Sequence, residues 1–261
     1  MDFVLIGTVA LIASGLALFS GFGLGTLLLP AFALFLPAPI AVAATAVVHL
    51  LNNVFKGALL WREANWRIVW RFGLPAIPAA MFGAWLLGKL GDTERLFVLE
   101  LGPWSGGPTA AGLTIGLMLI GFALLELSPA AQRIRAPERM MPVGGAMMGF
   151  LGGLTGQQGA LRSMFLLKSG MDAAQFIATG VMIAILVDLS RVPAYGVQLA
   201  SGASALTVRD AWLIATGTSA ALLGAWLGAR HVKKVTIAAV RYAVAALMIA
   251  IGCAMASGAI G

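Results

Sequence analysis

Charged residues are scarce in this sequence, and cysteine is scarcer still. Asp, Glu, Lys and Arg make up 10% of the 261 residues, whereas 60% are hydrophobic. Soluble domains carry about 25% charged residues, so this composition excludes a soluble fold and indicates an all-α integral membrane protein. The one cysteine, Cys253, excludes an internal disulfide and a cysteine metal cluster. We expect it to pack inside the last apolar run.

The sequence also lacks the motifs of several enzyme classes. It contains neither HExxH nor GxSxG, and GFGLGT has the wrong spacing for a dinucleotide-binding loop. His49 has no second histidine or carboxylate near it in the sequence, so we expect no metal site and no cofactor. We therefore expect no catalytic residue and no enzyme. A membrane-embedded enzyme or an assembly factor remains the competing class.

Long uncharged runs fill most of the chain. A helical span needs about 20 apolar residues, so the runs predict seven to ten crossings or part-crossings in one multi-pass domain, residues 1–261. We place this domain in the cytoplasmic membrane. The net charge of +7 would suggest a nucleic-acid partner for a soluble protein. Here the basic residues cluster in short loops beside the spans, which is the pattern that sets membrane topology. We expect the lipid bilayer as a partner and no nucleic acid.

Two apolar runs are interrupted by glycines, GFGLGTLLLP at 21–30 and GFLGGLTGQQGALRS at 149–163. Unwound backbone at membrane depth survives only where protein or a watery cavity surrounds it. A half-helix that begins there points N–H groups and a partial positive charge inward, which suits a small anion. The breaks supply these candidate substrate contacts: Gly23, Gly25, Gly156, Gln157, Gln158, Gly159 and Arg162.

A polar stripe follows the first break. Its residues fall at spacings of three and four along a span predicted for residues 39–60, which places them on one helical face. Lipid cannot form hydrogen bonds with the polar side chains of this face. The face should therefore line a cavity that points toward the glycine break. The stripe consists of Thr45, His49, Asn52, Asn53 and Lys56, and all but Lys56 join the candidate substrate site, together with Thr179 of the second half. We expect Asp188 and Arg191 to neutralise each other rather than to relay protons.

The chain reads as two copies, 1–128 and 140–258, joined by a linker over 129–139. Ala-Thr pairs end at Thr45 and Thr179, and GAWLLG from Gly83 resembles GAWLG from Gly224. Asn53 and Lys56 likewise match Asp188 and Arg191 in order.

The charges of the loops predict how the two copies are oriented. If each broken segment dips into the membrane and returns, each half keeps three full crossings. All three basic loops, 62–71, 133–139 and 230–234, then face the cytoplasm, and the halves are inverted copies. If each broken segment were instead two complete short spans, every loop would face the same side of the membrane as in this arrangement. This alternative stays open.

Over nearly its whole length the chain resembles the TauE/SafE family of sulfite exporters and related anion permeases. The resemblance rests on the duplicated glycine-rich segment, Pro30 after the first copy and the Ala-Thr pair after each. It implies a permease for small sulfur anions, inorganic or organic, in the cytoplasmic membrane. The chain departs from the family's glycine triplet and following proline in its second half, where it has TGQQGALRS.

The expected function is therefore transport of a small anion, sulfite-like or an organosulfonate, by alternating access. An anion that leaves a cell gains about 2.3 kcal/mol per charge per 100 mV of membrane potential, which favours export. Proton-coupled import through His49 is the alternative. A channel and a homo-oligomer also stay open.

Overall fold

The computed structural model describes residues 1–20, 24–91, 93–101, 104–130, 137–166, 169–201, 206–231 and 237–260. Five described helices are long and apolar enough to cross a membrane: Ala38–Glu63, Trp66–Gly91, Ala110–Leu127, Ala173–Ala200 and Val208–Gly228. The helices are α1 (Asp2–Ser20), α2 (Leu24–Ala33), α3 (Ala38–Leu60), α4 (Trp66–Gly91), α5 (Ala110–Leu127), α7 (Met141–Thr155), α8 (Gly159–Leu166), α9 (Ala173–Ser201), α10 (Val208–His231) and α11 (Ile237–Ala256). This is a multi-pass helical membrane protein, as the composition predicts.

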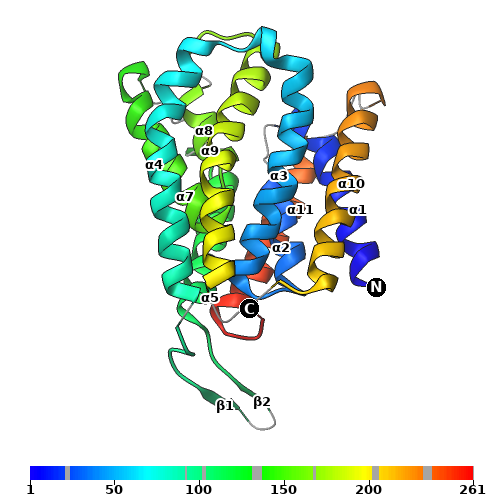
Figure 1. Ribbon diagram of the computed structural model, residues 1–261, viewed down its shortest axis with the longest axis vertical. Helices are drawn as coiled ribbons and strands as arrows, with labels where there is room; N and C mark the ends of the chain where they lie inside the picture. The colour runs from blue at the N-terminus through cyan, green and yellow to red at the C-terminus, as the bar shows by residue number, and fades with distance from the viewer. Residues whose placement is uncertain are drawn as a thin grey trace.

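Helices α3 and α9 lie side by side at the centre of the bundle, and the other helices surround them (Figure 1). Of the five span-length helices, α3 has the largest buried share. A proline lies in the first turn of α3. Its missing N–H removes no helix hydrogen bond there, since the first N–H groups of a helix have no internal partner. The two central helices carry most of the buried polar side chains, among them His49, Lys56, Asp188 and Arg191.

The segment α7–α8 begins and ends at the same end of the molecule. Glu138, just before α7, accepts a hydrogen bond from Arg71 near the start of α4, with Nη1 and Oε1 2.9 Å apart. Thr179 near the start of α9 accepts a bond from the backbone N–H of Asn65 at 2.9 Å, in the turn between α3 and α4. Both ends of α7–α8 therefore lie where α3 joins α4, at the top of Figure 1.

The segment α1–α2 begins and ends at the opposite end. Asp2 at the start of α1 forms an ion pair with Arg209 at the start of α10. Helix α2 runs back to the start of α3, at the lower end of the bundle in Figure 1. At 1.5 Å per residue, α2 and α8 are about 15 and 12 Å long, well short of a bilayer core of about 30 Å.

The helix contacts come in matched pairs. Helix α4 packs along α7, and α1 packs along α10; α4 also contacts α9, and α10 contacts α3. The pairs α3–α9 and α5–α11 complete the pattern. If the order α1 to α5 is exchanged with the order α7 to α11, this set of contacts maps onto itself.

Glycines make the closest of these contacts possible. A Cβ atom placed on Gly83 of α4 would lie 2.2 Å from the carbonyl oxygen of Phe150 on α7, and one placed on Gly224 of α10 would lie 2.2 Å from that of Leu11 on α1. On the α5–α11 pair, Gly116 and Gly252 each face the other's carbonyl oxygen. Small residues let backbones approach in membranes, where apolar burial drives helix association little.

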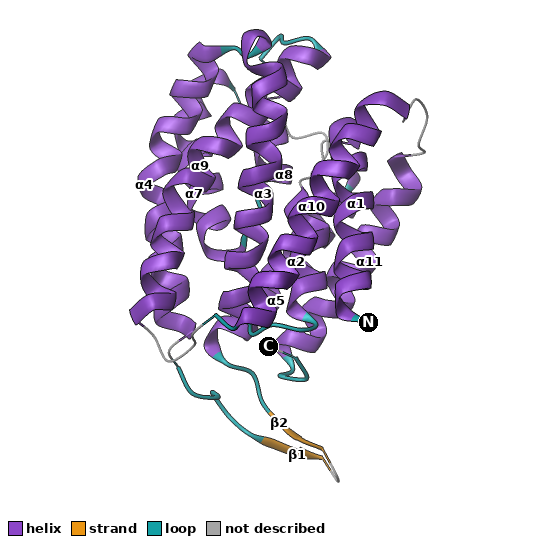
Figure 2. Cartoon of the chain, turned by 45° about the vertical axis from the view of Figure 1, so that its right-hand side comes forward, coloured by secondary structure: helices purple, strands orange, loops and turns teal. Residues whose placement is uncertain are grey.

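The structure differs from the sequence-based expectations in two details. A short antiparallel hairpin, β1 (Leu99–Leu101) paired with β2 (Trp104–Gly106), projects below the bundle between α4 and α5 (Figure 2). The sequence predicts a near-neutral loop over residues 89–107, between two spans. Cys253 is exposed on α11, so the expectation that it packs inside is wrong. Gly23, Asp92, Lys168 and most of the loop 230–234 lie outside the described residues.

Candidate functional site

The second glycine break is a helix end followed directly by a new helix. Helix α7 stops because Gly156 has φ +77°, the left-handed conformation that glycine adopts at least cost. Its N–H bonds the carbonyl oxygen of Gly152 at 2.9 Å, which closes the last turn. Gln157 and Gln158 follow outside any helix, and α8 begins at Gly159. The chain thus places two glutamines and a helix N-terminus at one point inside the protein.

The first break meets the second. A Cβ atom placed on Gly25, the second residue of α2, would lie 3.0 Å from the carbonyl oxygen of Gly156 and 3.6 Å from Cγ2 of Thr45. Only glycine allows this approach without a shift of the neighbouring backbone. The structure therefore brings together Gly25, Thr45 and Gly156, three of the residues that the sequence predicts. The hydroxyl of Thr45 donates to the carbonyl oxygen of Ala41 within α3 at 2.8 Å.

Asp188 on α9 is the hub of a buried polar network. Its Oδ1 accepts hydrogen bonds from Nε2 of Gln158 and from Nε of Arg191, both at 2.9 Å, and Nη2 of Arg191 lies 2.8 Å from the same oxygen. Its Oδ2 lies 2.6 Å from Nδ1 of His49 on α3. A carboxylate only accepts hydrogen bonds, so Nδ1 of His49 carries the hydrogen. The expected ion pair between Asp188 and Arg191 is present.

Asn53 completes the environment of His49. Its Nδ2 lies 3.3 Å from Nε2 of the imidazole and 3.0 Å from Nδ1. With Nδ1 donating to Asp188, Nε2 is the acceptor for Asn53, and both ring nitrogens have a partner. Both partners come from the predicted stripe or from the helix opposite it.

Arg191 also caps α7. Its Nη1 donates to the carbonyl oxygen of Gly152, and the hydroxyl of Tyr195 donates to that of Gly153. The last carbonyls of a helix lack internal partners and carry its partial negative charge, so a cation is favoured there. The helix end and Asp188 together balance the charge of Arg191, which is fully buried.

Lys56 lies one turn along α3 from Asn52. In the amide orientation that satisfies both neighbours, Oδ1 of Asn52 accepts a hydrogen bond from Nζ of Lys56 at 2.9 Å. Its Nδ2 then donates to the hydroxyl of Ser14 on α1 at 2.9 Å and to the carbonyl oxygen of Ala221 on α10 at 3.3 Å. Lys56 is only 5% exposed and forms no ion pair with the carboxylates of the described residues.

Arg162 lies on α8, one turn beyond the break. It is partly buried, and its Nη1 donates to the carbonyl oxygen of Gly180 on α9 at 3.0 Å. Its charge acts on both Lys56 and Asp188. Among the described residues, no carboxylate lies within ion-pair distance of Arg162 or of Lys56.

Two polar atoms of the break lack a hydrogen-bond partner among the described residues. They are the amide nitrogen Nε2 of Gln157 and the amide oxygen Oε1 of Gln158. The two side chains are 3% and 4% exposed. A buried polar group without a partner costs about 1–3 kcal/mol, so such groups mark places where a ligand is expected. We call the set His49, Asn52, Asn53, Lys56, Gln157, Gln158, Arg162, Asp188 and Arg191 the central polar cluster.

Thr179 is the predicted residue that joins this cluster least. It lies nine residues before Asp188, about 13 Å along the axis of α9. Its hydroxyl accepts from the backbone of Asn65 and donates to Sδ of Met171 at 3.4 Å, so it fixes the connection between α3 and α4. Its role as a substrate contact stays a prediction, as do those of Gly159 and of Gly23.

The predicted site omits Ser14, Lys56, Asp188, Arg191 and Tyr195. Asp188 and Arg191 are charges inside a long apolar helix, a signal of function that the sequence does carry. Tyr195 lies four residues after Arg191, on the same helical face. Ser14 gives no signal, because a single serine in an apolar helix is common and its partner lies 38 residues away.

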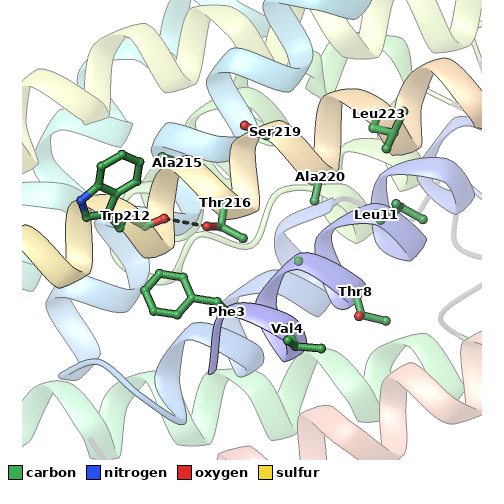
Figure 3. Close-up of a pocket in the computed structure, with 11 residues that line it drawn as sticks. Phe3, Val4, Thr8, Leu11, Trp212, Ala215, Thr216, Ser219, Ala220 and Leu223 are labelled. Atoms are coloured by element: carbon green, nitrogen blue, oxygen red, sulfur yellow. Dashed lines mark hydrogen bonds between the residues drawn. The ribbon is translucent and has the colours of Figure 1, made fainter. Parts of the chain in front are cut away.

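A groove of about 610 Å³ on the outer surface, between α1 and α10, is a separate feature (Figure 3). Apolar side chains such as Phe3, Leu11 and Leu223 dominate its lining. The hydroxyl of Thr216 donates to the carbonyl oxygen of Trp212 in its own helix at 2.8 Å. Such a surface suits lipid and offers nothing to compensate an anion.

Comparison with known proteins agrees with this architecture. No curated protein matches the chain. A family model described as "Sulfite exporter TauE/SafE" matches residues 6–255, which include both broken segments and the whole central polar cluster. The family is one of membrane transporters, and the chain belongs to it.

Proposed function

We propose that this protein is a carrier that moves a small sulfur-containing anion, a sulfite-like oxyanion or an organosulfonate, across the cytoplasmic membrane. The substrate lies where the break between α7 and α8 meets the start of α2. The family supports the class of substrate. The single observation that carries the site is Nε2 of Gln157, a buried N–H donor without a partner among the described residues.

The charges of the central polar cluster support an anion rather than a cation. Arg191 and Asp188 neutralise each other, and the end of α7 takes up the rest of the positive charge on Arg191. Lys56 and Arg162 are two further basic side chains of the cluster, and no carboxylate of the described residues lies within ion-pair distance of either. An anion at the N-terminus of α8 would accept from the Gln157 donor, and the positive charges of Lys56 and Arg162 would favour it.

Alternating access is the mechanism that the arrangement of the two halves supports. One broken segment enters from each end of the bundle, and the helix contacts of residues 1–128 match those of 140–258 under exchange. We infer two inverted copies, each with one re-entrant pair and three crossings, joined by a cytoplasmic linker over 129–139. Carriers of this design expose a fixed site to either side by rocking one part against another.

The orientation follows from the basic residues. The turn between α3 and α4 holds Arg62, Arg67 lies in the first turn of α4, and Arg139 precedes α7 at the same end. Trp66 and Trp70 lie beside this turn, with tilted rings whose centroids are 6.3 Å apart, as is typical of a membrane interface. The basic residues favour the cytoplasmic side for this end, which leaves the hairpin outside. Export of an anion then runs down the membrane potential, at about 2.3 kcal/mol per charge per 100 mV.

Proton-coupled import is the second candidate, and the contact between His49 and Asp188 favours it. A histidine is the side chain that most readily exchanges a proton near neutral pH. Inward movement of an anion against the potential needs such a coupled cation.

The test is transport by the purified protein in proteoliposomes. We expect saturable flux of sulfite or a sulfonate, and counterflow of labelled anion, because a carrier exchanges bound substrate. Gln157→Leu should raise the apparent KM roughly 10- to 150-fold, the effect of losing one hydrogen bond to a charged group. The matched control is Gln175→Leu, an exposed glutamine on α9, which should leave KM unchanged.

Three results would contradict the proposal. Flux that does not saturate and shows no counterflow would indicate a channel. Consumption of the anion without uptake into vesicles would indicate an enzyme. A lack of binding and flux with sulfite, thiosulfate, sulfate and sulfonates alike would reject the substrate class.

A further inference from the structure

We infer that the site selects an anion that carries its own hydrogen-bond donor, and that Oε1 of Gln158 accepts that hydrogen. The ligand class is a sulfur monoanion with an O–H group, such as hydrogen sulfite or a hydroxysulfonate, in preference to an anion with acceptor oxygens alone. The inference rests on the proposed function, because it assigns the specificity of the same site.

The orientation of the Gln158 amide is fixed by its neighbour. Nε2 faces Oδ1 of Asp188 at 2.9 Å, and a carboxylate can only accept a hydrogen bond. Rotation of the amide by half a turn would place two oxygens against each other. Oε1 therefore points away from Asp188, and it has no donor among the described residues.

Burial makes Oε1 of Gln158 discriminate between ligands with and without a hydrogen-bond donor. Gln158 is 4% exposed and packs over Gly152, where a Cβ atom would lie 2.9 Å from Cγ of the glutamine. A fully deprotonated oxyanion offers only lone pairs, so it would leave Oε1 unsatisfied and would face it with like partial charge. A ligand with one hydrogen satisfies Oε1, while its anionic oxygens accept from Nε2 of Gln157.

Asp188 contributes to the preference through Gln158. Its carboxylate accepts from Nε2 of Gln158, and its charge is balanced by Arg191 and shared with His49. The charged and titratable groups around this point come from α3, α8 and α9, and they are His49, Lys56, Arg162, Asp188, Arg191 and Tyr195.

A charge-matched pair of sulfonates tests the inference at one pH. Hydroxymethanesulfonate and ethanesulfonate are monoanions of similar shape that differ by an O–H in place of a methyl group. We expect the wild-type protein to bind the hydroxyl compound roughly 5- to 150-fold more tightly, as measured by competition against labelled substrate or by thermal shift. Equal affinity, or a preference for ethanesulfonate, would overturn the inference, because Oε1 would then be served by water or by nothing.

Two variants assign the preference to one atom. Gln158→Met removes the acceptor and should bring the ratio of the two affinities close to one. Gln157→Met removes a donor and should weaken both ligands while the ratio stays as in the wild type. A ratio that survives Gln158→Met would also overturn the inference, and the wild-type comparison decides the matter if either variant fails to fold.

Sulfite provides a second test of the inference, because its hydrogen-bearing monoanion loses that hydrogen near neutral pH. We expect the KM for total sulfite, divided by the KM for ethanesulfonate at the same pH, to rise about tenfold per pH unit above that ionisation. A ratio that falls with pH would show preference for the dianion. If the wild-type protein binds and moves neither sulfite nor either sulfonate, the proposed function itself fails; if it moves them without regard to the hydrogen, only this inference fails.

Discussion

Nδ1 of His49 lies 2.6 Å from Oδ2 of Asp188, and this contact joins residues 139 positions apart in the two halves of the chain. It connects the two central helices at the depth where the broken segments meet. Asp188 also orients Gln158 and balances Arg191. One carboxylate therefore holds together a histidine, an arginine and the glutamine of the break, so changes at this residue should affect stability and transport together.

Asp188→Asn should destabilise the protein strongly. Asparagine keeps the shape but leaves the fully buried Arg191 without its counter-charge, and breaking one partner of a buried pair costs about 3–5 kcal/mol. We expect a clear fall in the apparent melting temperature in detergent. Glu138→Gln is the control, because it removes the exposed ion pair with Arg71, and such pairs contribute about 0–1 kcal/mol. Equal effects of the two changes would contradict a structural role for the Asp188 network.

His49→Gln tests the second candidate, proton-coupled import. If His49 carries the coupled proton, this change should flatten the pH dependence of transport between about pH 5 and 8, because glutamine cannot take up a proton and still donates to Asp188. The measurement uses ethanesulfonate, whose charge stays constant in this range. If the variant keeps the wild-type slope, His49 takes no part in proton coupling.

Gly83→Ala and Gly224→Ala should each weaken one of the two matched helix pairs. The added Cβ would lie 2.2 Å from a backbone oxygen of the partner helix, which forces the helices apart, and overpacking of this kind costs about 1–3 kcal/mol. Gly121→Ala is the control, since nothing lies within 4 Å of its Cβ position. That change should be neutral or stabilising by up to about 1 kcal/mol, because alanine is the better helix former. Thermal unfolding of the three variants measures the difference.

Much of the fold could be predicted because the bilayer leaves a chain few choices. The length of the apolar runs predicts the spans. The glycine clusters predict the end of α7 and the start of α2. Unwound backbone at membrane depth needs protein around it, which predicts that these breaks lie inside the protein. The stripe on α3 was assigned to the interior from its spacing, and the structure buries Thr45, His49, Asn52 and Asn53. The hairpin β1–β2 was missed because three-residue strands outside the membrane carry too little pattern to recognise.

The partners within the site were harder to predict. Helical spacing shows that His49 faces inward, but it cannot show that α9 brings Asp188 to it, because that depends on the register between two helices. The same limit applies to Arg191 and the end of α7. The expected ion pair between Asp188 and Arg191 forms, and spacing within one helix cannot show that both residues also bind groups on other elements.

Single cysteines test the orientation of the halves. On a Cys253→Ser background, cysteines in place of the exposed Glu94 and Glu138 should react with an impermeant reagent from opposite sides of the membrane. Glu94 lies beyond α4, toward the hairpin, and Glu138 lies at the start of α7. Glu63→Cys should label from the same side as Glu138→Cys. Val208, exposed at the start of α10, corresponds to Glu63 just before α4 under exchange of the halves, so Val208→Cys should label from the opposite side to Glu63→Cys. Labelling of both Glu63→Cys and Val208→Cys from one side would contradict inverted halves.

Gly156→Ala, compared with Gly170→Ala, separates the role of the break in substrate binding from the strain of a left-handed backbone conformation. Gly156 and Gly170 both have left-handed conformations, with φ of +77° and +70°, and neither has an atom within 3.4 Å of a Cβ position. Alanine should therefore strain both sites by a similar amount, about 1–2 kcal/mol, and lower the melting temperature alike. Gly156 alone adjoins Gln157 and meets Gly25, so its backbone aims the donors of the break at the substrate. We expect Gly156→Ala to raise the KM for sulfonate transport, while Gly170→Ala, in the turn before α9, leaves it unchanged. If both variants transport with the wild-type KM, the geometry of the break does not determine substrate binding, and the site lies elsewhere along α3 and α9.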